Sequence, residues 1–488
     1  MFLLTYFAQE EWSVFDVVIV GAGVIGGMVA RELSRYHLNV CLLEKENDVA
    51  MGASKANSGI IHGGYDPVPG TMKAKMNTQG VALLYQAAKD LNVRHRNNGS
   101  LVCAFGEEEE PALDHLLQRG KENGIDQLSI ISGDEARKLE PNLSEKVSKA
   151  LYIPTAGIIC PYDLTIAAIG NAMDNGVKLY RNFCVSSIEK KEHFVITSQD
   201  GQQVEAKYLV NCAGGHSDKI AALMGDGFFT IIPRAGEYML LDKTEGTRVD
   251  HTIFQVPSKE GKGILVSPTA DGNLLTGPTA IKVDSPENKE VTDSGLEMVH
   301  RLAAKSVPSV DFRKVITSFT GVRSSEKHDD FIIQASEKVE NAVHVAAIDS
   351  PGLTSCVAIA KYAVGILGSL GLAMTEKADW NGKRENMHAF REMNDEEKDA
   401  FIKHNPSYGK IVCRCETVSE GEMMEAILRN PPAMDLDGVK RRTRGGMGRC
   451  QGGFCSPYVL KLIAKAHNVK LEEVTKCGKG SNPLIGKL

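Results

Sequence analysis

Four cysteines near the C-terminus have the residue type and the spacing to hold a metal centre. One residue separates Cys413 from Cys415, and four residues separate Cys450 from Cys455. Thiolates bind tetrahedral zinc as well as iron–sulfur clusters, so both kinds of centre are open at this point. Zinc ribbons usually use two C-x2-C pairs, whereas this chain combines C-x-C with C-x4-C. The spacing therefore favours an iron–sulfur site.

Both cysteine pairs precede expected helix starts. Ser419 with Glu422 forms a capping box, and Ser456 is an N-cap serine followed by Pro457 at the first helical position. The positive end of a helix dipole stabilises anionic ligands, and a diiron cluster on four thiolates carries a net charge of about 2−. Three basic residues are near enough in sequence to offset part of that charge or to bind an acidic partner: Arg442, Arg444 and Arg449.

A glycine pattern at the other end of the chain predicts a dinucleotide site. Gly21, Gly23 and Gly26 lie between an apolar strand pattern and a helical pattern. Gly21 permits the tight turn, Gly23 lets the backbone approach a pyrophosphate, and Gly26 lets the helix pack on the strand. Glu44 follows Gly26 by eighteen residues, where a carboxylate accepts hydrogen bonds from a ribose 2′-hydroxyl and disfavours NADP. The pattern does not separate FAD from NAD.

The elements that must position these groups alternate between strands and helices. Residues 15–20 and 39–43 are short apolar runs with helical spacing over 24–36 between them, which indicates a βαβ unit. β-type patterns dominate residues 177–211 and 233–279. Further expected elements are a long helix over 71–91, a strand over 342–348 and a buried helix from there to about residue 374. We therefore expect an α/β fold, with a Rossmann-like nucleotide domain, an inserted β-rich substrate domain and a small, mainly helical C-terminal domain.

Length and composition limit the classes of function. At 488 residues the chain is too long for one ordinary core, so two or three domains are expected. The net charge of −6 gives no reason to expect nucleic-acid binding, and eleven cysteines without a framework pattern argue against a secreted, disulfide-bonded protein. Residues 1–13 make a poor signal peptide, and the sequence has no run of about 18 uncharged apolar residues. We expect a cytoplasmic protein without a transmembrane segment, with peripheral membrane contact left open.

Several motifs occur in order along residues 15–375 and together resemble a known family. They lie at residues 57–66, 233–238, 261–263, 277–280, 321–323 and 349–355. The set resembles the FAD-dependent amino-acid and hydroxy-acid oxidase superfamily, and within it the glycerol-3-phosphate oxidase/dehydrogenase branch. Residues 444–455 resemble the bacterioferritin-associated-ferredoxin-like [2Fe-2S] domain, which is fused to the catalytic subunit of anaerobic glycerol-3-phosphate dehydrogenases and occurs in some amino-acid-oxidising flavoenzymes. The implied cofactors are FAD and a [2Fe-2S] cluster held by Cys413, Cys415, Cys450 and Cys455.

The resemblance also implies boundaries and cofactor contacts. An FAD-dependent oxidoreductase region is expected over 14–379, with its substrate domain around 86–150 and 232–320. Residues 380–409 are charged and poor in large apolar groups, so a linker with at most one exposed helix is expected before a [2Fe-2S]-binding domain over 410–475. The expected FAD contacts are Gly21, Gly23, Gly26, Glu44, Ser54, Asn57, Ser58, Gly214, Gly352, Leu353 and Thr354.

The expected substrate groups are a histidine, two cations and a serine. Oxidation of an alcohol needs an acceptor for the hydroxyl proton, and His62 in its glycine-flanked loop suits this role, unless it only orients the flavin or caps a turn. Lys262 lies between glycines and Arg323 follows Gly321, so both could enter a pocket and select an anionic substrate. Taken singly, such cations are more often surface residues. The resemblance places both in the substrate pocket, and it places Ser350 close to the flavin, although a serine at a strand end is commonly structural.

The expected activity is that of an FAD-dependent dehydrogenase which oxidises sn-glycerol-3-phosphate to dihydroxyacetone phosphate. A flavin takes two electrons from its substrate, whereas an iron–sulfur centre passes them singly, so the second centre favours delivery to a partner protein or a quinone over direct transfer to oxygen. Two alternatives stay open. One is a dehydrogenase or oxidase of L-2-hydroxyglutarate or of another hydroxy or amino acid. The other is an electron-transfer subunit of a larger hetero-complex, against which the intact His62, Lys262 and Arg323 argue.

Overall fold

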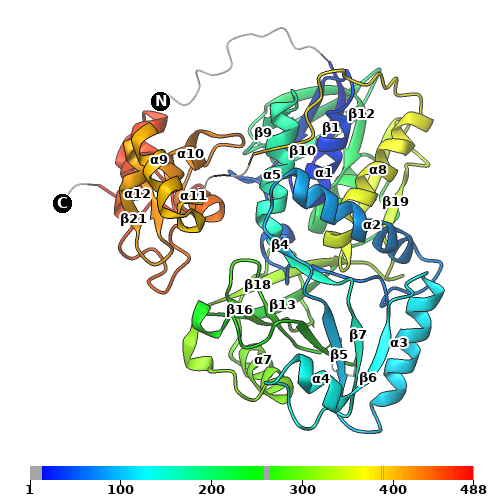
Figure 1. Cartoon of the computed structure of the whole chain (residues 1–488). Helices are drawn as coiled ribbons and strands as arrows, with labels where there is room; N and C mark the ends of the chain where they lie inside the picture. The colour runs from blue at the N-terminus through cyan, green and yellow to red at the C-terminus, as the bar shows by residue number, and fades with distance from the viewer. Residues whose placement is uncertain (1–13, 258–262, 386, 388, 487–488) are drawn as a thin grey trace.

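The chain forms three bodies in a computed structural model that describes residues 14–257, 263–385, 387 and 389–486. Figure 1 shows a nucleotide domain above, an inserted domain below it, and a small C-terminal domain at one side. The first two each contain a large sheet, and the third is mainly helical. This arrangement confirms the predicted α/β fold class. Lys262 lies outside the described residues, as do residues 1–13.

The centre of the nucleotide domain is a parallel sheet. β1 (Phe15–Val20) lies between β2 (Val40–Leu43) and β12 (Gln203–Asn211), with β9 (Lys178–Tyr180) beyond β2 and β20 (Ala342–Ala346) beside β12. All of these pairings are parallel, and parallel strands need crossover connections that usually carry helices. The predicted βαβ unit and the strand predicted over 342–348 are confirmed. Three antiparallel strands complete the sheet, namely β10 (Val185–Lys190), β11 (Phe194–Ser198) and β19 (Ile332–Ala335).

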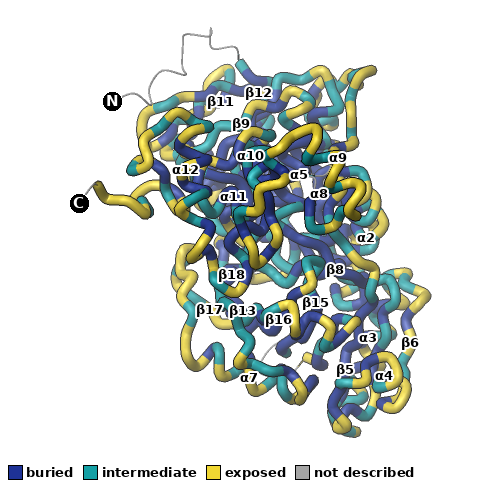
Figure 2. Tube along the Cα trace, turned by 60° about the vertical axis from the view of Figure 1, so that its left-hand side comes forward, coloured by how far each residue is buried: buried dark blue, intermediate teal, exposed yellow. Residues whose placement is uncertain are grey.

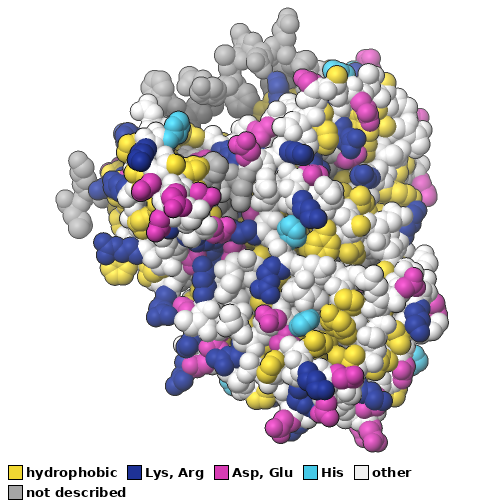
Figure 3. All heavy atoms as spheres, viewed as in Figure 1, with side chains coloured by type: hydrophobic (Ala, Val, Ile, Leu, Met, Phe, Trp, Pro, Cys, Tyr) yellow, Lys and Arg dark blue, Asp and Glu magenta, His cyan; other side chains and the backbone are white. Residues whose placement is uncertain are grey.

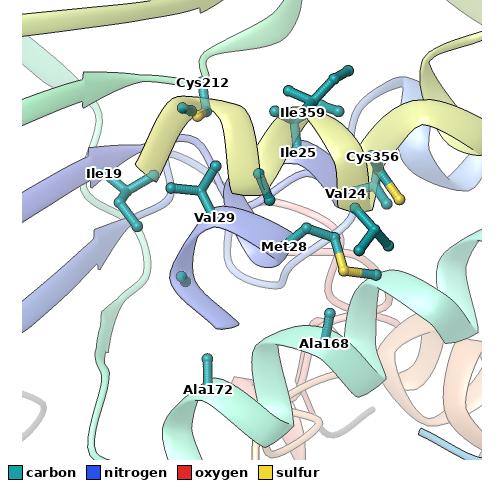
Figure 4. Close-up of a cluster of buried hydrophobic side chains, with 14 of the residues drawn as sticks. Ile19, Val24, Ile25, Met28, Val29, Ala168, Ala172, Cys212, Cys356 and Ile359 are labelled. Carbon is teal, nitrogen blue, oxygen red and sulfur yellow. The ribbon is translucent and has the colours of Figure 1, made fainter. Parts of the chain in front are cut away.

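Helix α1 (Val24–Leu33) is enclosed on both sides by other helices. α5 (Pro161–Asp174) and α8 (Gly352–Ser369) both pack against it. Figure 4 shows the side chains of this contact, with Ala168 of α5 and Ile359 of α8 facing the helix. Burial on both sides fixes the position of the α1 N-terminus, which comes directly after β1. α2 (Met72–Asp90), which matches the predicted long helix, packs along α8.

α8 is the most apolar helix of this core. It ends at Ser369, five residues before the predicted end near 374, and Gly371 just beyond it adopts a φ of +97°. By length and composition α8 is apolar enough to cross a membrane, but 61% of it is buried inside the protein. Because α8 packs between α1 and α2, its apolar composition is that of a helix in the protein core. Among the described residues it is the single helix of this kind.

The inserted domain is built on a nine-stranded sheet. Its longest strands are β13 (Ile232–Leu241) and β18 (Val315–Ser325), which pair antiparallel so that Arg234 lies opposite Arg323. The remaining strands are β5 (Ser100–Ala104), β6 (Ser129–Ser132), β7 (Lys149–Ile153), β14 (Thr252–Gln255), β15 (Leu265–Pro268), β16 (Leu274–Gly277) and β17 (Ile281–Lys282). The helices are α3 (Glu110–Glu122), α4 (Gly133–Leu139) and α7 (Asp293–Ser306).

Short elements join the two large domains. β3 (Ile60–Ile61), β8 (Gly157–Ile159) and β4 (His95–Arg96) form a three-stranded sheet at their boundary. α6 (Ser217–Leu223) follows β12 in the nucleotide domain. The small sheet carries the chain from the nucleotide fold into the segment that contains His62.

The C-terminal domain consists of a short hairpin and three helices. The hairpin is β21 (Ile411–Cys413) with β22 (Val418–Ser419), and the helices are α10 (Glu420–Leu428), α11 (Leu436–Thr443) and α12 (Ser456–His467). The capping box of Ser419 and Glu422 is confirmed at the start of α10. The predicted cap at Ser456 is wrong by one residue. Ser456 is already helical and Cys455 occupies the N-cap, so Pro457 is the second residue of α12.

Residues 380–409 run along the surface between the nucleotide and C-terminal domains. The Trp380 ring lies under the guanidinium of Arg35 at 4.9 Å, and its indole nitrogen donates to Ser34. Phe390 and Tyr408 are buried. α9 (Asp395–His404) buries none of its residues. The segment thus carries one exposed α-helix, α9. Aromatic side chains before and after this helix attach the segment to the rest of the protein.

Buried ion pairs fix the C-terminal domain to the nucleotide domain. Asp48, which follows β2 and has 0% exposure, lies 2.5 Å from Arg441 and 2.8 Å from Arg442 of α11. α11 also packs against α5 (Figure 2). Burial disfavours the charged form of Asp48, yet the charges of Arg442 and Arg441 outweigh it and hold the pKa of this carboxyl well below its usual range.

A second ion-pair group fixes the C-terminal domain to the inserted domain. Arg444, at the C-cap of α11, lies 2.7 Å from Asp271 and 2.9 Å from Glu416. Asp271 also pairs with Arg94 at 3.1 Å, and Lys243 pairs with Glu416 at 2.9 Å. The side chains of Arg444, Asp271 and Glu416 are only 4%, 5% and 3% exposed, so each depends on its partners for compensation.

Replacing Asp48 with Asn is expected to loosen the C-terminal domain. Two buried guanidinium groups lose their counter-ion, which costs about 3–5 kcal/mol for a buried pair. We expect faster proteolysis within residues 380–409 and a lower urea midpoint. Because the folded-state pKa lies below the unfolded value of about 4, the stabilisation from Asp48 is present above pH 4 and is lost as the pH falls below it.

The matched control is Asp437→Asn, which removes an exposed pair with Lys476 at 3.0 Å. A surface pair of this kind contributes about 0–1 kcal/mol. Equal urea midpoints for the two variants would contradict the assignment of Asp48 as the buried contact between the domains.

Candidate active site and metal centre

One large cavity lies between the nucleotide and inserted domains. Its volume is about 1550 Å³, large enough for an extended dinucleotide and a small substrate together. Its walls include the loops after β1, β2, β12 and β20, where the carboxyl ends of parallel strands meet. Ligands of open α/β sheets bind at this edge, so the topology points to the same place as the glycine pattern.

Gly21 and Gly26, at the start of α1, leave no room for side chains. A Cβ on Gly21 would lie 2.5 Å from the carbonyl oxygen of Cys212, and one on Gly26 would lie 1.9 Å from the carbonyl oxygen of Gly21. Gly21 also adopts a φ of +106°. Gly23 and Val24 line the cavity, and the Ser54 hydroxyl accepts a hydrogen bond from the Val24 amide at 2.8 Å. The helix N-terminus therefore faces the cavity, as pyrophosphate binding requires.

Glu44 lines the same cavity at the end of β2. One carboxylate oxygen accepts a hydrogen bond from the Ala22 amide at 2.9 Å, and the other accepts one from the Glu46 amide at 3.0 Å. Burial raises the pKa of Glu44 to about 7. Each oxygen keeps acceptor capacity for a ribose hydroxyl. The donor set therefore fits a dinucleotide.

The loop before β3 forms another wall. Asn57 holds this loop, because its amide donates to the Ala53 carbonyl at 2.9 Å and its oxygen accepts from the Gly59 amide at 2.9 Å. The Ser58 hydroxyl lies 3.2 Å from the hydroxyl of Tyr238. Gly214, with a φ of +55°, lines the cavity after β12. Ser54, Asn57, Ser58 and Gly214 are thus all at the cavity.

The start of α8 completes the wall. Gly352 and Leu353 line the cavity, whereas Thr354 lies fully buried behind them. Its hydroxyl accepts a hydrogen bond from the His62 amide at 2.9 Å and donates to the Ile60 carbonyl at 3.3 Å. Gly26 also lies behind the wall. Thr354 therefore positions the histidine loop, and the structure does not bring its side chain to the cavity.

His62 faces the cavity from a loop held on several sides. Its ring stacks on Phe254 at a centroid distance of 6.0 Å, and Asn77 donates to its carbonyl oxygen at 3.2 Å. Its Nε2 lies 3.4 Å from the Ser350 hydroxyl, near the outer limit of a hydrogen bond. Ser350 comes directly before α8, so the structure brings these two predicted residues together. A ring fixed in this way can exchange a proton with a ligand in the cavity.

Arg323 enters the cavity from β18. It is half-buried, and within the described part of the chain no hydrogen bond or ion pair of its side chain is found. Arg234 on the opposite strand and Arg301 on α7 line the same cavity. A gathering of cations in a partly enclosed space suits an anionic ligand. The other predicted cation, Lys262, lies outside the described residues.

The cavity side chains that sequence reasoning missed include Lys73, Tyr238 and Arg301. Tyr238 belongs to the motif over 233–238, but its contact with Ser58 spans 180 positions. Lys73 pairs with Asp349 at 2.8 Å and is one of several lysines on α2. Arg301 follows ordinary helical spacing on α7. The sequence around these residues has no pattern that distinguishes a cavity side chain from a surface side chain.

The four predicted cysteine ligands form two pairs in the C-terminal domain. The sulfur atoms of Cys415 and Cys450 lie 3.6 Å apart, and Cys413 is hydrogen-bonded to Cys455. Two thiolates on one tetrahedral metal with bonds of about 2.3 Å are about 3.8 Å apart, so each pair suits one metal. Within the described residues no three His, Cys, Asp or Glu side chains converge on a single ion position. Two separate pairs fit a diiron cluster better than a single zinc ion.

Local hydrogen bonds favour one anionic sulfur in each pair, and they raise the pKa of the other members, Cys415 and Cys455. The hydrogen bond with Cys455 lowers the pKa of Cys413 to about 6, with help from the backbone amides of Gly446 and Glu416. Burial opposes ionisation of Cys450, but several backbone amides outweigh it and lower its pKa. Amide donors aimed at sulfur are typical of iron–sulfur sites. The donor set therefore fits a [2Fe-2S] cluster.

Comparison with known proteins identifies both sites. The family described as FAD dependent oxidoreductase matches residues 16–365, and the family described as BFD-like [2Fe-2S] binding domain matches residues 411–465. A glycerol 3-phosphate dehydrogenase of Caloramator mitchellensis is 44% identical over 474 residues, which cover 97% of this chain and 98% of that protein. An L-2-hydroxyglutarate dehydrogenase of Pongo abelii is 30% identical over 366 residues, covering 71% of this chain and 86% of that protein.

A solved structure of an FAD-containing enzyme is also similar to this chain. The L-alpha-glycerophosphate oxidase of Mycoplasma pneumoniae with FAD bound has a TM-score of 0.73 at 33% identity, covering 76% of this chain and 98% of that one. Together with the family matches, this confirms the two predicted cofactors, FAD and a [2Fe-2S] cluster. The residues that line the cavity between the two large domains fit this FAD.

Metal analysis tests the cysteine assignment. Purified, anaerobically reconstituted protein is expected to contain about two iron and two sulfide per chain and no stoichiometric zinc. Replacing Cys413 with Ser removes one ligand, and we expect loss of the cluster absorption with less than half of the iron retained. The matched control is Cys477→Ser, because Cys477 is an exposed cysteine of the same domain. Equal iron loss in both variants would count against the ligand set.

Proposed function

The chain belongs to the FAD dependent oxidoreductase family, and from that premise we propose that it oxidises sn-glycerol-3-phosphate to dihydroxyacetone phosphate. The observation that carries the proposal is the position of Arg323, a cation without a partner among the described residues, in the same cavity as His62. An alcohol that also bears a dianionic group can use both residues at once. The Caloramator relative carries the matching activity in its name.

The proposed chemistry needs few groups of the protein. FAD, when bound, takes up the hydrogen and the two electrons removed from the substrate carbon. His62 accepts the hydroxyl proton at Nε2, and Ser350 at 3.4 Å orients that nitrogen. Arg323 binds the phosphate, with Lys262 as a further proposed ligand. Phe254 stacks on the imidazole and shields one of its faces from water.

We further propose that the [2Fe-2S] cluster carries electrons away from the flavin. Short contacts connect the two sites. The Ile159 amide donates to the carbonyl of Gly59, which lines the cavity, at 2.8 Å. Three residues farther along the chain, the hydroxyl of Tyr162 lies 3.6 Å from the sulfur of Met447. Gly448 then packs directly on Cys415. A continuous chain of contacts between the centres supports transfer to a partner protein or a quinone over direct reaction with oxygen.

A second substrate class is kept as an alternative. L-2-Hydroxyglutarate also joins an alcohol to anionic groups, and the Pongo relative is named for it. That relative matches 71% of this chain, whereas the Caloramator dehydrogenase matches 97%, which includes the cysteine-bearing domain. An electron-transfer subunit without a substrate of its own is disfavoured, because such a subunit has no need of His62 and Arg323 in one cavity. We also propose that the protein is cytoplasmic and that it works within a hetero-complex.

Substrate choice is tested by flavin reduction without oxygen. Glycerol-3-phosphate is expected to bleach the flavin of the purified protein at least a hundredfold faster than L-2-hydroxyglutarate or amino acids at equal concentration. Stopped-flow absorption measures the rates. The reverse order of rates would overturn the proposed substrate and leave the family assignment intact.

The role of His62 is tested by substitution. His62→Ala is expected to slow flavin reduction by about 10²–10⁴-fold, because no other group takes the hydroxyl proton. The FAD content should be unchanged, since the cofactor is also held by the glycine turn and Glu44. The matched control is His115→Ala, at an exposed position of α3. Parent-like reduction by His62→Ala would remove the base assignment.

A further inference from the structure

The cluster ligands are buried unequally. Cys413 and Cys455 are 2% and 3% exposed, whereas Cys415 is exposed and Cys450 is half-buried. Because Cys415 pairs with Cys450, the iron that these two residues would hold would be nearer to solvent than the iron that Cys413 and Cys455 would hold. An electron that leaves the protein has its shortest route through the outer pair.

A large apolar side chain lies beside this outer pair. Phe454, between Cys450 and Cys455 in sequence, is 89% exposed. The loop that carries it is not loose, because Gly453 donates to the Cys450 carbonyl at 3.0 Å and Ser456 donates to the Gly452 carbonyl at 3.0 Å. Isolated exposed apolar residues are common on proteins. This one is held outward by a rigid loop next to a redox centre.

Exposed basic residues are close in sequence to this aromatic residue and to the cluster cysteines. Residues 411–488 carry thirteen Lys and Arg against eight Asp and Glu. Three of these arginines, Arg441, Arg442 and Arg444, are buried and paired with carboxylates, so the surface excess of positive charge comes from the others. Arg414, Arg449 and Lys461 are exposed near the cluster, and Pro457 is exposed at the start of α12. Arg449 also reaches Asp242 of the inserted domain at 3.2 Å. We call Arg414, Arg449, Phe454, Pro457 and Lys461 the Phe454 patch.

Figure 3 shows basic side chains with hydrophobic ones at the lower edge of the C-terminal domain, in the same view as Figure 1. An exposed aromatic residue together with exposed basic residues is the composition of a protein docking surface, where aromatic residues and arginine contribute most of the binding energy. A membrane surface would need several large apolar side chains on one face. The exposed face of α12 beyond Phe454 offers Pro457, Lys461 and Lys465, and none of these is a large apolar residue.

We propose that the Phe454 patch is the docking surface for a small one-electron carrier protein whose own surface is acidic around an apolar centre. The proposal rests on the proposed function of the cluster as the exit for electrons. Oxidation of one alcohol to a ketone releases two electrons and two protons. Two oxidised carriers each take one electron at the Cys415–Cys450 side, the cluster returns to its diferric form after each transfer, and the protons pass to solvent. Opposite charges speed the encounter of the two proteins, so the rate should fall as salt rises.

The test uses cytochrome b5, a small acidic one-electron haem carrier of higher potential than the alcohol substrate, as the probe for the full-length holoprotein. The protein is reduced without oxygen, and stopped-flow absorption gives the second-order rate of cytochrome b5 reduction at several salt concentrations. Phe454→Ser is expected to lower this rate at least tenfold. Lys461→Glu is expected to lower it at least threefold at low salt and to weaken its salt dependence. Reduction of the flavin and the cluster by glycerol-3-phosphate should be unchanged in both variants.

Matched controls lie in the same domain. Leu428→Ser removes an apolar residue that is 63% exposed, and Lys479→Glu reverses an exposed charge 24 positions beyond Cys455, the last of the cluster cysteines. Parent-like rates in Phe454→Ser, or equal losses in the controls, would overturn the proposal. So would Phe454-dependent reduction of a quinone in anionic lipid vesicles at a rate above that of cytochrome b5. A second arm of the experiment reduces the cluster with dithionite instead of glycerol-3-phosphate. Docking is then tested even if glycerol-3-phosphate does not reduce the cluster. Failure of glycerol-3-phosphate to reduce the cluster would contradict the proposed function and not the docking surface.

Discussion

The buried contacts of Arg441 and Arg442 on α11, and of Arg444 at its C-cap, are the constraint on which the two-centre arrangement depends. Arg441 and Arg442 pair with Asp48 of the nucleotide domain, and Arg444 pairs with Asp271 of the inserted domain. A buried guanidinium without its carboxylate costs several kcal/mol, so the C-terminal domain has one favourable position against both neighbours. The cluster is thereby held at a fixed place relative to the cavity and does not swing on residues 380–409.

The cavity itself depends on contacts between elements far apart in the sequence. Thr354 at the start of α8 holds the backbone of His62, and Phe254 of β14 covers its ring. Tyr238 of β13 reaches across to Ser58. The cofactor end is built by the nucleotide domain alone, whereas the substrate end needs both large domains. This division explains how relatives with one cofactor can differ in substrate, because the inserted domain can change while the glycine turn stays the same.

The parts of the structure that depend on neighbouring residues in the sequence were predictable. The βαβ unit at 15–43, the long helix at 71–91 and the capping box at Ser419 follow from periodicity and caps, and all three are confirmed. The start of α12 and the end of α8 differ from their predictions by one and about five residues, because helix ends depend on local backbone geometry. Asp48 and Arg442 are 394 positions apart, so no local pattern reveals their contact. The roles proposed for Lys262 and for the other site residues stay predictions. The cavity nevertheless brings together most of the predicted site residues that the structure describes.

The most direct test of two connected redox centres is an anaerobic titration of the holoprotein with glycerol-3-phosphate, followed by absorption and electron paramagnetic resonance. We predict that the flavin bleaches and that the signal of a reduced [2Fe-2S] cluster grows with it, without any added mediator. A flavin that bleaches fully while the cluster stays oxidised, or a preparation with zinc in place of iron, would contradict the account.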